Sequence, residues 1–280
     1  MNIPVRRLLA GASTVAVAAT VALVVSQSAA DASPATQACG TALSSSELTQ
    51  LVSLTDTATI TGPNDLARYD VAVTRNQQAT AILAAHKDFR GLFAVGLDIS
   101  ERNGLSPLQH TTGAFADPAF GHAFSLQLLR LWLSNLHRQL LGSSTDPQWT
   151  RYFDLAHQCS TSKTQIAMAG YNAHLQVDIP HALAAVHATK ANQTDFNTVV
   201  GAVALQSPAL IGVTDSTYGT HLGAVWQVVI SNAQVIGSLA FANGLGLQVP
   251  ALASATETEI QVLWRATDAA LPVLVAIYGG

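Results

Sequence analysis

One segment of this sequence combines residue types that could carry out chemistry with a spacing that brings them together. It covers residues 171–181 and reads Tyr-Asn-Ala-His-Leu-Gln-Val-Asp-Ile-Pro-His. His174 and Asp178 are four residues apart, so on a helix their side chains lie on one face, one turn apart. A carboxylate in that position can hold an imidazole in a fixed tautomer as a general base, or the two groups can share a divalent cation. This segment is therefore our leading candidate for a functional site.

Two neighbours of the pair could extend the site. Asn172 precedes His174 in the same segment and is our third candidate for a catalytic role. His181 returns to the same helical face if Pro180 bends the helix only slightly. The alternative is that His174 and Asp178 form an ordinary side-chain pair that locks two helices together, and spacing alone favours this structural role.

The composition excludes one class of partner. Charged residues make up only 11% of the chain, with 13 basic and 17 acidic residues and a formal net charge of −4, and no basic cluster follows Arg7. Nucleic-acid binding needs a clustered positive surface that displaces counterions from phosphate, so we expect no nucleic-acid partner. The hydrophobic share of 49% favours a large apolar core and suits a small-molecule or lipid-like ligand.

Residues 1–32 have the features of a signal peptide. Two arginines at positions 6 and 7 precede an uncharged run over residues 8–25, and Ala-Asp-Ala at residues 30–32 is a pattern that signal peptidase accepts. We expect cleavage before Ser33 and a secreted protein. The residues around the arginine pair favour the general secretory route over the twin-arginine route.

The apolar run of the signal peptide raises the alternative of an uncleaved membrane anchor, because about 18 apolar residues can just span a bilayer. Its many Ala, Ser and Thr residues and the cleavage pattern favour cleavage. Later in the chain, residues 199–211 are apolar but too few, and they contain Pro208. We therefore expect no stable membrane span after cleavage.

Beyond the signal peptide the chain contains two cysteines, Cys39 and Cys159. An even count fits the oxidising environment outside the cytoplasm, and two buried free thiols are the alternative. We predict a disulfide between them, which would tie the N-terminal arm to a helix in the middle of the chain. In the chain-entropy model such a bridge stabilises the fold by roughly 4 to 5 kcal/mol.

Helix signals dominate the rest of the sequence, and strand signals are nearly absent. After a flexible arm over residues 33–45, residues 46–280 are predicted to form one all-α, multi-helix domain with orthogonal or bundle-like packing. Asp117-Pro118 and Asp146-Pro147 are typical helix starts, an N-cap residue followed by proline. Residues 88–109 are ambiguous between helix and loop, and Pro180 is expected to break or kink its helix. The predicted helices cover residues 46–54, 66–85, 119–141, 147–159, 161–177, 181–188, 195–206, 220–242 and 256–278.

The central segment also resembles a known family. Residues 170–183 match the hallmark of an actinobacterial secreted family catalogued only as a domain of unknown function, Gly-hydrophobic-Asn-Ala-His-hydrophobic-x-x-Asp-hydrophobic-Pro-x-Ala-Leu. The resemblance covers most of the chain after residue 33 and implies that His174 and Asp178 belong to the site, with Tyr69 and Arg265 as further candidates. Other positions that match the family are Asp65, Thr74, Phe115, Asp117, Asp195 and Phe196.

The same His-x-x-x-Asp segment followed by proline is similar to a ligand pair in the helical, zinc-dependent phospholipases C and the related single-strand nucleases. That similarity implies a divalent metal such as zinc, bound by His174 and Asp178 with Asp117 or a histidine from another helix as a further ligand. Such an ion would lower the pKa of a bound water and polarise a carbonyl or phosphoryl oxygen. One ion is expected in place of the three in those enzymes, because this chain contains a single motif of this kind.

Two functions of different class follow from these observations. The first is an exported, hydrolase-like enzyme that acts on a small or lipid-like substrate at His174 and Asp178, with or without a metal. The second is a non-catalytic secreted protein whose helical core encloses an apolar pocket for a ligand. The sequence contains no Gly-x-Ser-x-Gly, no phosphate-binding glycine loop and no His-Glu-x-x-His motif, so the His–Asp segment carries the functional prediction.

Overall fold

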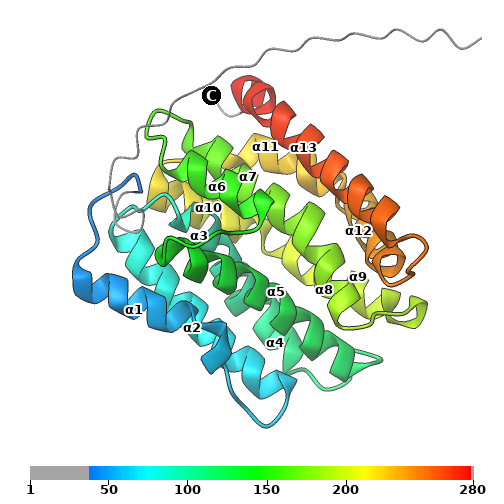
Figure 1. The fold of residues 1–280 in the computed structure, drawn as a ribbon. Coiled ribbons are helices and arrows are strands. Elements are labelled where there is room, and N and C mark those ends of the chain that lie inside the picture. The colour runs from blue at the N-terminus through cyan, green and yellow to red at the C-terminus, as the bar shows by residue number, and fades with distance from the viewer. Residues whose placement is uncertain (1–37, 279–280) are drawn as a thin grey trace, which may run out of the picture. The chain divides into compact units, whose positions relative to one another are not determined.

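The computed structural model describes residues 38–278 of the chain. The predicted signal peptide and the first part of the predicted arm lie outside these residues. No strand occurs between residues 38 and 278, which confirms the predicted all-α fold, and these described residues belong to one compact unit. Figure 1 shows the arrangement of the helices. They are α1 (Ser45–Thr55), α2 (Asp65–Ala85), α3 (Gly91–Ser100), α4 (Ser106–Gln109), α5 (Pro118–Leu140), α6 (Pro147–Ala156), α7 (Lys163–Ala173), α8 (Ile179–Ala185), α9 (Gln193–Leu205), α10 (Ser207–Tyr218), α11 (Leu222–Ser231), α12 (Ala233–Leu247) and α13 (Ala253–Tyr278).

Side-chain caps explain where several helices begin. Ser44 and Glu47 form a capping box before α1, and Asn64 accepts a hydrogen bond from the backbone of α2. Asp117 caps α5 as its sequence predicts, with Pro118 in the first turn. Asp146 also stands at a helix start, but its carboxylate does not cap α6. It accepts a hydrogen bond from Asn135 and forms an ion pair with an arginine of α5.

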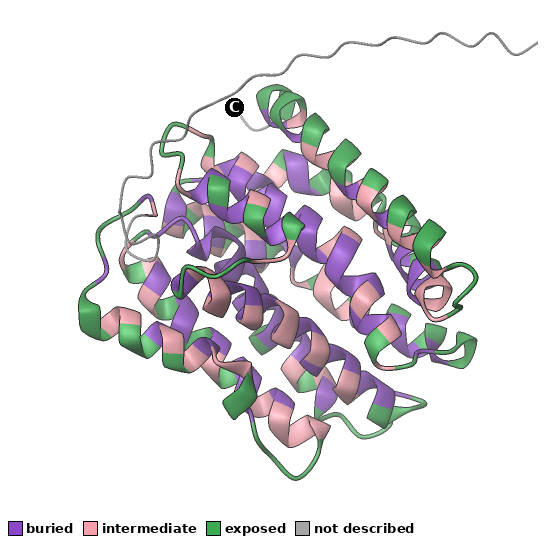
Figure 2. Cartoon of the chain, viewed as in Figure 1, coloured by how far each residue is buried: buried purple, intermediate pink, exposed green. Residues whose placement is uncertain are grey.

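Helix α3 lies at the centre of the molecule. All residues of Gly91–Ser100 are buried, and a helix that is apolar on all sides must be surrounded by other elements. It packs against α2, α7 and α10, and the buried part of the ribbon in Figure 2 runs through this region. Around it, α2 packs against α1 and α5, α8 against α12, and α13 against α7. The segment that was ambiguous in the sequence is thus the central helix of the fold.

Two π-helical segments interrupt otherwise continuous helices. Glu101–Leu105 joins α3 to α4, and His174–Asp178 joins α7 to α8. In each case a proline follows two positions after the segment, Pro107 in the first and Pro180 in the second. Proline lacks an N–H and collides with the carbonyl four residues before it in a regular α-helix, and the wider π turn relieves this conflict. Of the two outcomes expected at Pro180, a break does not occur: helical turns continue through it, and the regular α-helix is interrupted by the π turn that precedes it.

The C-terminal helices differ from the predicted ones in two places. Helix α10 was not predicted: the predicted helix over residues 195–206 was not followed by another, whereas Ser207 and Pro208 begin α10 directly after α9. The predicted helix over residues 220–242 is two helices, α11 and α12, which meet at Asn232 outside helical dihedral angles. Both differences lie where one helix follows another without a loop, so composition alone marks no boundary.

The predicted disulfide is confirmed. The sulfur atoms of Cys39 and Cys159 are 2.01 Å apart, and they join the segment before α1 to the turn after α6. The same segment is held by backbone hydrogen bonds from Cys39 N to Ala156 O and from Phe89 N to Cys39 O. The described end of the predicted flexible arm, residues 38–44, is therefore fixed to the helical core although it has no regular secondary structure.

One helix among residues 38–278 is long and apolar enough to cross a membrane by length and composition, namely α13. Two bent pairs pass the same test when each pair is counted as one span: Lys190–Leu205 with Ser207–Tyr218, and α11 with α12. We expected no such segment beyond the signal peptide. The expectation was based on runs without any charge, whereas the apolar part of α13 contains Arg265 and Asp268.

Candidate functional site

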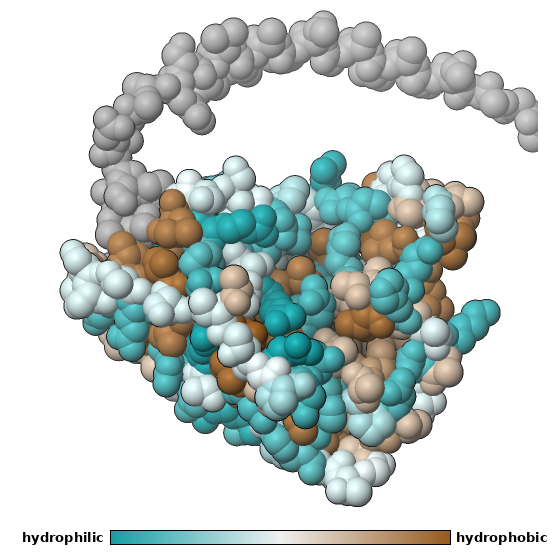
Figure 3. All heavy atoms as spheres, turned by 60° about the horizontal axis from the view of Figure 1, so that its bottom comes forward, coloured by the Kyte–Doolittle hydropathy of each residue, from teal (hydrophilic) through white to brown (hydrophobic). Residues whose placement is uncertain are grey.

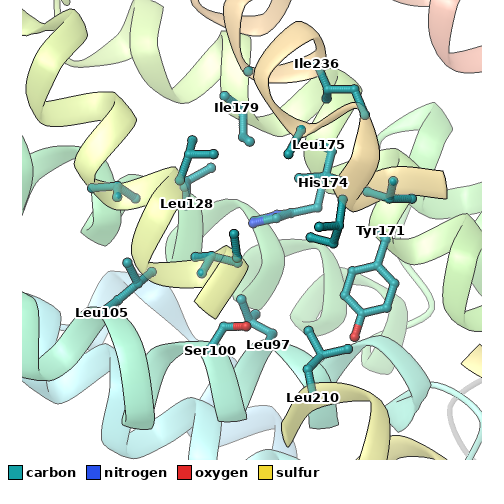
Figure 4. A pocket seen from close by; sticks show the side chains of 18 of the residues that line it. Leu97, Ser100, Leu105, Leu128, Tyr171, His174, Leu175, Ile179, Leu210 and Ile236 are labelled. Atoms are coloured by element: carbon teal, nitrogen blue, oxygen red, sulfur yellow. The ribbon is translucent and has the colours of Figure 1, made fainter. Parts of the chain in front are cut away.

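An apolar pocket lies between α3, α5 and α7 on one side and α9 to α12 on the other. Its volume is about 110 Å³, of the same order as the roughly 150 Å³ apolar cavity that holds benzene in an engineered protein. The side chains of Leu97, Leu128, Ile179 and Leu210 surround it, and the ring of His174 points into it (Figure 4). Most of the lining consists of Leu, Ile, Val, Phe and Ala side chains, and the lining residues with polar side-chain atoms are Ser100, Glu101, Tyr171, His174 and Trp226.

The lining residues are not equally buried. Those from α3, α5 and α7 are buried, whereas the lining residues of α9, α11 and α12 are mostly half-buried. The half-buried lining residues of these three helices are Val200, Val203, Ala204, Val229, Ile230, Ala233 and Ile236. The pocket therefore has its closed end at the central helices and its mouth between α9 and the α11–α12 pair.

His174 and Asp178 face each other, as their spacing predicts. His174 Nδ1 lies 3.3 Å from Asp178 Oδ2, with His174 9% exposed and Asp178 1% exposed. When the carboxylate accepts a hydrogen bond from Nδ1–H, the other ring nitrogen, Nε2, has no proton and is a base. Because the ring points into the cavity, the pair presents this nitrogen to whatever occupies the pocket.

Asp178 is itself held by two residues of α6. Trp149 Nε1 lies 3.2 and 3.1 Å from its two carboxylate oxygens, and Gln148 Nε2 donates to Oδ1 at 3.3 Å. Trp149 belongs to an aromatic cluster that includes Phe93, whose ring centroid lies 5.3 Å from that of His174. The imidazole thus has a fixed carboxylate partner and a packed ring behind it, which is how a general base is oriented in a protein interior.

Glu101 is a buried carboxyl group in the wall of the same pocket. It is 1% exposed, and its Oε2 accepts a hydrogen bond of 2.5 Å from the hydroxyl of Tyr69. The pKa of Glu101 is raised from 4.5 to about 8: burial is the main cause, the hydrogen bond from Tyr69 acts in the opposite direction, and the charge of Asp98 adds to the rise. Burial together with Glu101 also raises the pKa of Tyr69. Glu101 is therefore a neutral carboxylic acid at pH 7.

Glu101, Gln148 and Trp149 were not predicted as site residues, since each reaches its partner only through the tertiary fold. A signal did exist for Glu101, because it directly follows ten residues that are mostly apolar and carry one acid. A carboxylate in such a helix has no solvent face and is forced into the interior. Tyr69, a predicted candidate, joins the site indirectly, because its hydroxyl contacts Glu101 and its ring does not line the pocket.

Asn172 and His181, the two candidates beside the pair, make their hydrogen bonds with residues other than His174 and Asp178. Asn172 Nδ2 donates to the backbone oxygen of Trp264 at 3.0 Å, which ties α7 to α13. His181 Nδ1 lies 2.8 Å from Val177 O, and its Nε2 lies 2.9 Å from a carboxylate oxygen of Glu257. The π turn adds one residue to the helix between positions 174 and 181, which rotates the later face by about 100°, so His181 does not return to the side of His174.

Asp117 and Arg265 also lie in other surroundings. The Asp117 carboxylate caps α5 and accepts a hydrogen bond from Asn192, and Arg265 is exposed with its guanidinium 6.0 Å from the ring centroid of Trp264. Within residues 38–278, no group of three or more His, Cys, Asp or Glu side chains could hold a metal ion. The His174–Asp178 pair offers two ligands where a protein zinc site uses at least three, so the residues present do not fit the expected metal.

The site lies in the part of the chain that comparison with known proteins identifies. Residues 70–210, from α2 to α10, match the model of the "Family of unknown function (DUF5995)". The chain belongs to this family. The matched region contains both π-helical segments and the His174–Asp178 pair, and it ends before α11. No curated protein and no solved structure matches the chain, so the function is argued from the geometry of the site.

Proposed function

We propose that this member of the DUF5995 family is a secreted, hydrolase-like enzyme that acts on a small or lipid-like substrate in the apolar pocket. The observation that carries the proposal is the imidazole of His174, bonded to the buried carboxylate of Asp178 and directed into the pocket. The disulfide between Cys39 and Cys159 and the predicted signal peptide support secretion, since disulfides persist in oxidising compartments.

The proposed reaction is hydrolysis of an ester by general base catalysis. His174 Nε2 removes a proton from a water molecule while the water oxygen bonds to the carbonyl carbon. The bond to the leaving oxygen then breaks, and the proton on Nε2 passes to that oxygen. Asp178 stabilises the transient imidazolium, and the apolar walls bind the acyl part of the substrate by burying it from water.

Turnover of p-nitrophenyl esters of graded acyl length tests this proposal. Replacement of His174 by Gln should lower kcat/KM by on the order of 10²- to 10⁴-fold, the usual contribution of a general base. Asp178→Asn should lower it as well, because the imidazole loses its orientation. His221→Gln is the matched control, since His221 is exposed and does not line the pocket. Full activity in His174→Gln would contradict the proposal.

A non-catalytic binding protein is the second candidate, and the nearly uniform apolar lining of the pocket favours it. In that case the His174–Asp178 pair would serve to hold α7 and α8 in place. Binding of hexan-1-ol by the wild-type protein, without turnover of any ester in the series, would select this function over the enzyme.

A further inference from the structure

Helices α9 to α12 carry almost no charge. Between Asp195 and Glu257, the sequence contains one Asp, Glu, Lys or Arg residue, Asp215. Its Oδ1 accepts hydrogen bonds from Thr220 Oγ1 at 2.5 Å and from the backbone N–H of Leu222 at 3.1 Å. The one charge in this part of the chain is therefore engaged with the protein itself, and the surface of these helices is left without an available ionic group.

The C-terminal part of the chain, from α9 to α13, exposes nearly all of the large apolar side chains that are exposed among residues 38–278. Six such side chains lie on α9, α11 and α12 or in the turn after α12, and four more lie on α13, whereas one, Leu141, lies elsewhere. In Figure 3 hydrophobic side chains gather on the side that α12 and α13 occupy in Figure 1, beside a more hydrophilic centre. The ten are Leu205, Val228, Val235, Leu239, Val249, Leu252, Val262, Val273, Ile277 and Tyr278.

Three of these exposed side chains are next in sequence to residues that line the pocket on its half-buried side. Leu205 is 79% exposed and follows Ala204, Val228 precedes Val229, and Val235 is 59% exposed and precedes Ile236. Each of these neighbours is a half-buried lining residue. We call Leu205, Val228 and Val235 the apolar rim, because each is exposed and is next in sequence to a lining residue on the half-buried side of the pocket.

We propose that this apolar rim docks on a neutral lipid surface, from which an acyl chain enters the pocket. Large exposed apolar patches mark protein or membrane contact sites. The lipid surface is favoured because α13 and both bent helix pairs have the length and hydropathy of membrane segments. Protein interfaces, in contrast, surround their apolar centre with a polar rim. The three rim residues lie on α9, α11 and α12, whose one charged residue, Asp195, is buried and accepts hydrogen bonds from the backbone of Ala116 and Asp117. The acyl character of the ligand rests on the proposed function; the docking itself does not.

Flotation with vesicles of pure phosphatidylcholine tests the docking. The wild-type protein should float with the vesicles, and its binding should not weaken in about 0.5 M NaCl because no ionic contact is involved. The double variant Leu205→Asp/Val235→Asp should bind at least about tenfold more weakly, since two buried apolar contacts are lost. Leu141→Asp is the matched control, because Leu141 is 56% exposed but lies at the end of α5, and it should bind like the wild type.

Two further measurements separate a loss of vesicle binding from a loss of folding and from the enzymatic proposal. Thermal unfolding of the double variant should match the wild type, because both replaced side chains are exposed. The variant His174→Gln should float like the wild type, so a failure of the enzymatic proposal leaves the docking result intact. Wild-type protein that stays unbound, or a double variant that floats equally well, would overturn the proposal. So would a dimer that the double variant loses without any vesicle binding, because the rim would then contact a second copy of the chain.

Discussion

A carboxyl group that is removed from water keeps its proton to a higher pH, and Glu101 is the residue of this protein that shows it most clearly. Its pKa is raised by burial to about 8 in the folded chain, against 4.5 without this burial. Below pH 4.5 it is protonated in both the folded and the unfolded chain. Between pH 4.5 and 8 the unfolded chain releases this proton and the folded chain retains it, so the contribution of Glu101 to the free energy of unfolding falls as the pH rises.

Replacement of Glu101 by Gln should remove this pH dependence. The neutral amide can still accept a hydrogen bond from Tyr69 and has no charge to desolvate. Denaturant unfolding at several pH values should show the variant gaining stability over the wild type as the pH rises from about 5 to 8, by on the order of a few kcal/mol. The exposed Glu259 supplies the control: Glu259→Gln should follow the wild type. Parallel curves for Glu101→Gln and wild type would show that Glu101 is not held neutral.

At the residue scale, side-chain contacts within one helix could be predicted from the sequence, whereas side-chain contacts between helices could not. The pairing of His174 with Asp178 follows from their local spacing, and the structure contains it. Trp149 lies 29 residues from Asp178, and Tyr69 lies 32 residues from Glu101, so no local pattern relates them. Asn172 could not be assigned either, because its partner is a backbone oxygen of α13.

At the scale of elements, the position of His174 depends on a close crossing of α7 and α3. A Cβ atom added at Gly170 would lie 2.6 Å from Cβ of Phe93, which is closer than real Cβ atoms approach. The glycine in the motif of residues 170–180 thus allows the ring of Phe93 to pack near His174. A larger residue there would push α7 away from α3 and displace the imidazole.

Gly170→Ala should therefore lower the free energy of unfolding by about 1–3 kcal/mol, the usual cost of overpacking. Gly201→Ala is the matched control, because Gly201 is exposed on α9 and a Cβ there meets nothing within 4 Å. That change should leave stability equal or raise it by roughly 0.5–1 kcal/mol, as expected for Gly to Ala in a helix. Chemical denaturation measures both, and equal stability of the two variants would contradict the crossing described above.

The π-helical segments show why helix boundaries were harder to predict than helix content. Pro107 and Pro180 are visible in the sequence as interruptions, and on local rules both should end a helix. In the structure each proline follows a π turn, and both turns contribute residues to the pocket, Glu101 and Leu105 from one and His174 and Leu175 from the other. π turns occur often at functional sites, and here they contain Glu101 and His174, two of the polar residues that line the pocket.

At the scale of the whole molecule, charged residues are distributed unevenly between two parts of the chain. The charged residues lie mainly on the helices up to α8 and on α13, while residues 196–256 contain a single one. The disulfide spans 120 residues and ties the segment before α1 to the turn after α6, on the charged side of this division. The pocket lies between the two parts, with its polar groups on α3 and at the end of α7 and its mouth on the uncharged helices.

The central claim is that His174 presents a basic nitrogen to an apolar ligand in this pocket. Histidine ring ¹⁵N spectra at about pH 8.5, where histidine is ordinarily neutral, test it most directly with hexan-1-ol as the probe. We predict that His174 carries its proton on Nδ1 and that hexan-1-ol shifts its Nε2 resonance, while the exposed His221 is unaffected. A proton on Nε2, or a His174 resonance that does not move at saturating hexan-1-ol, would contradict the claim.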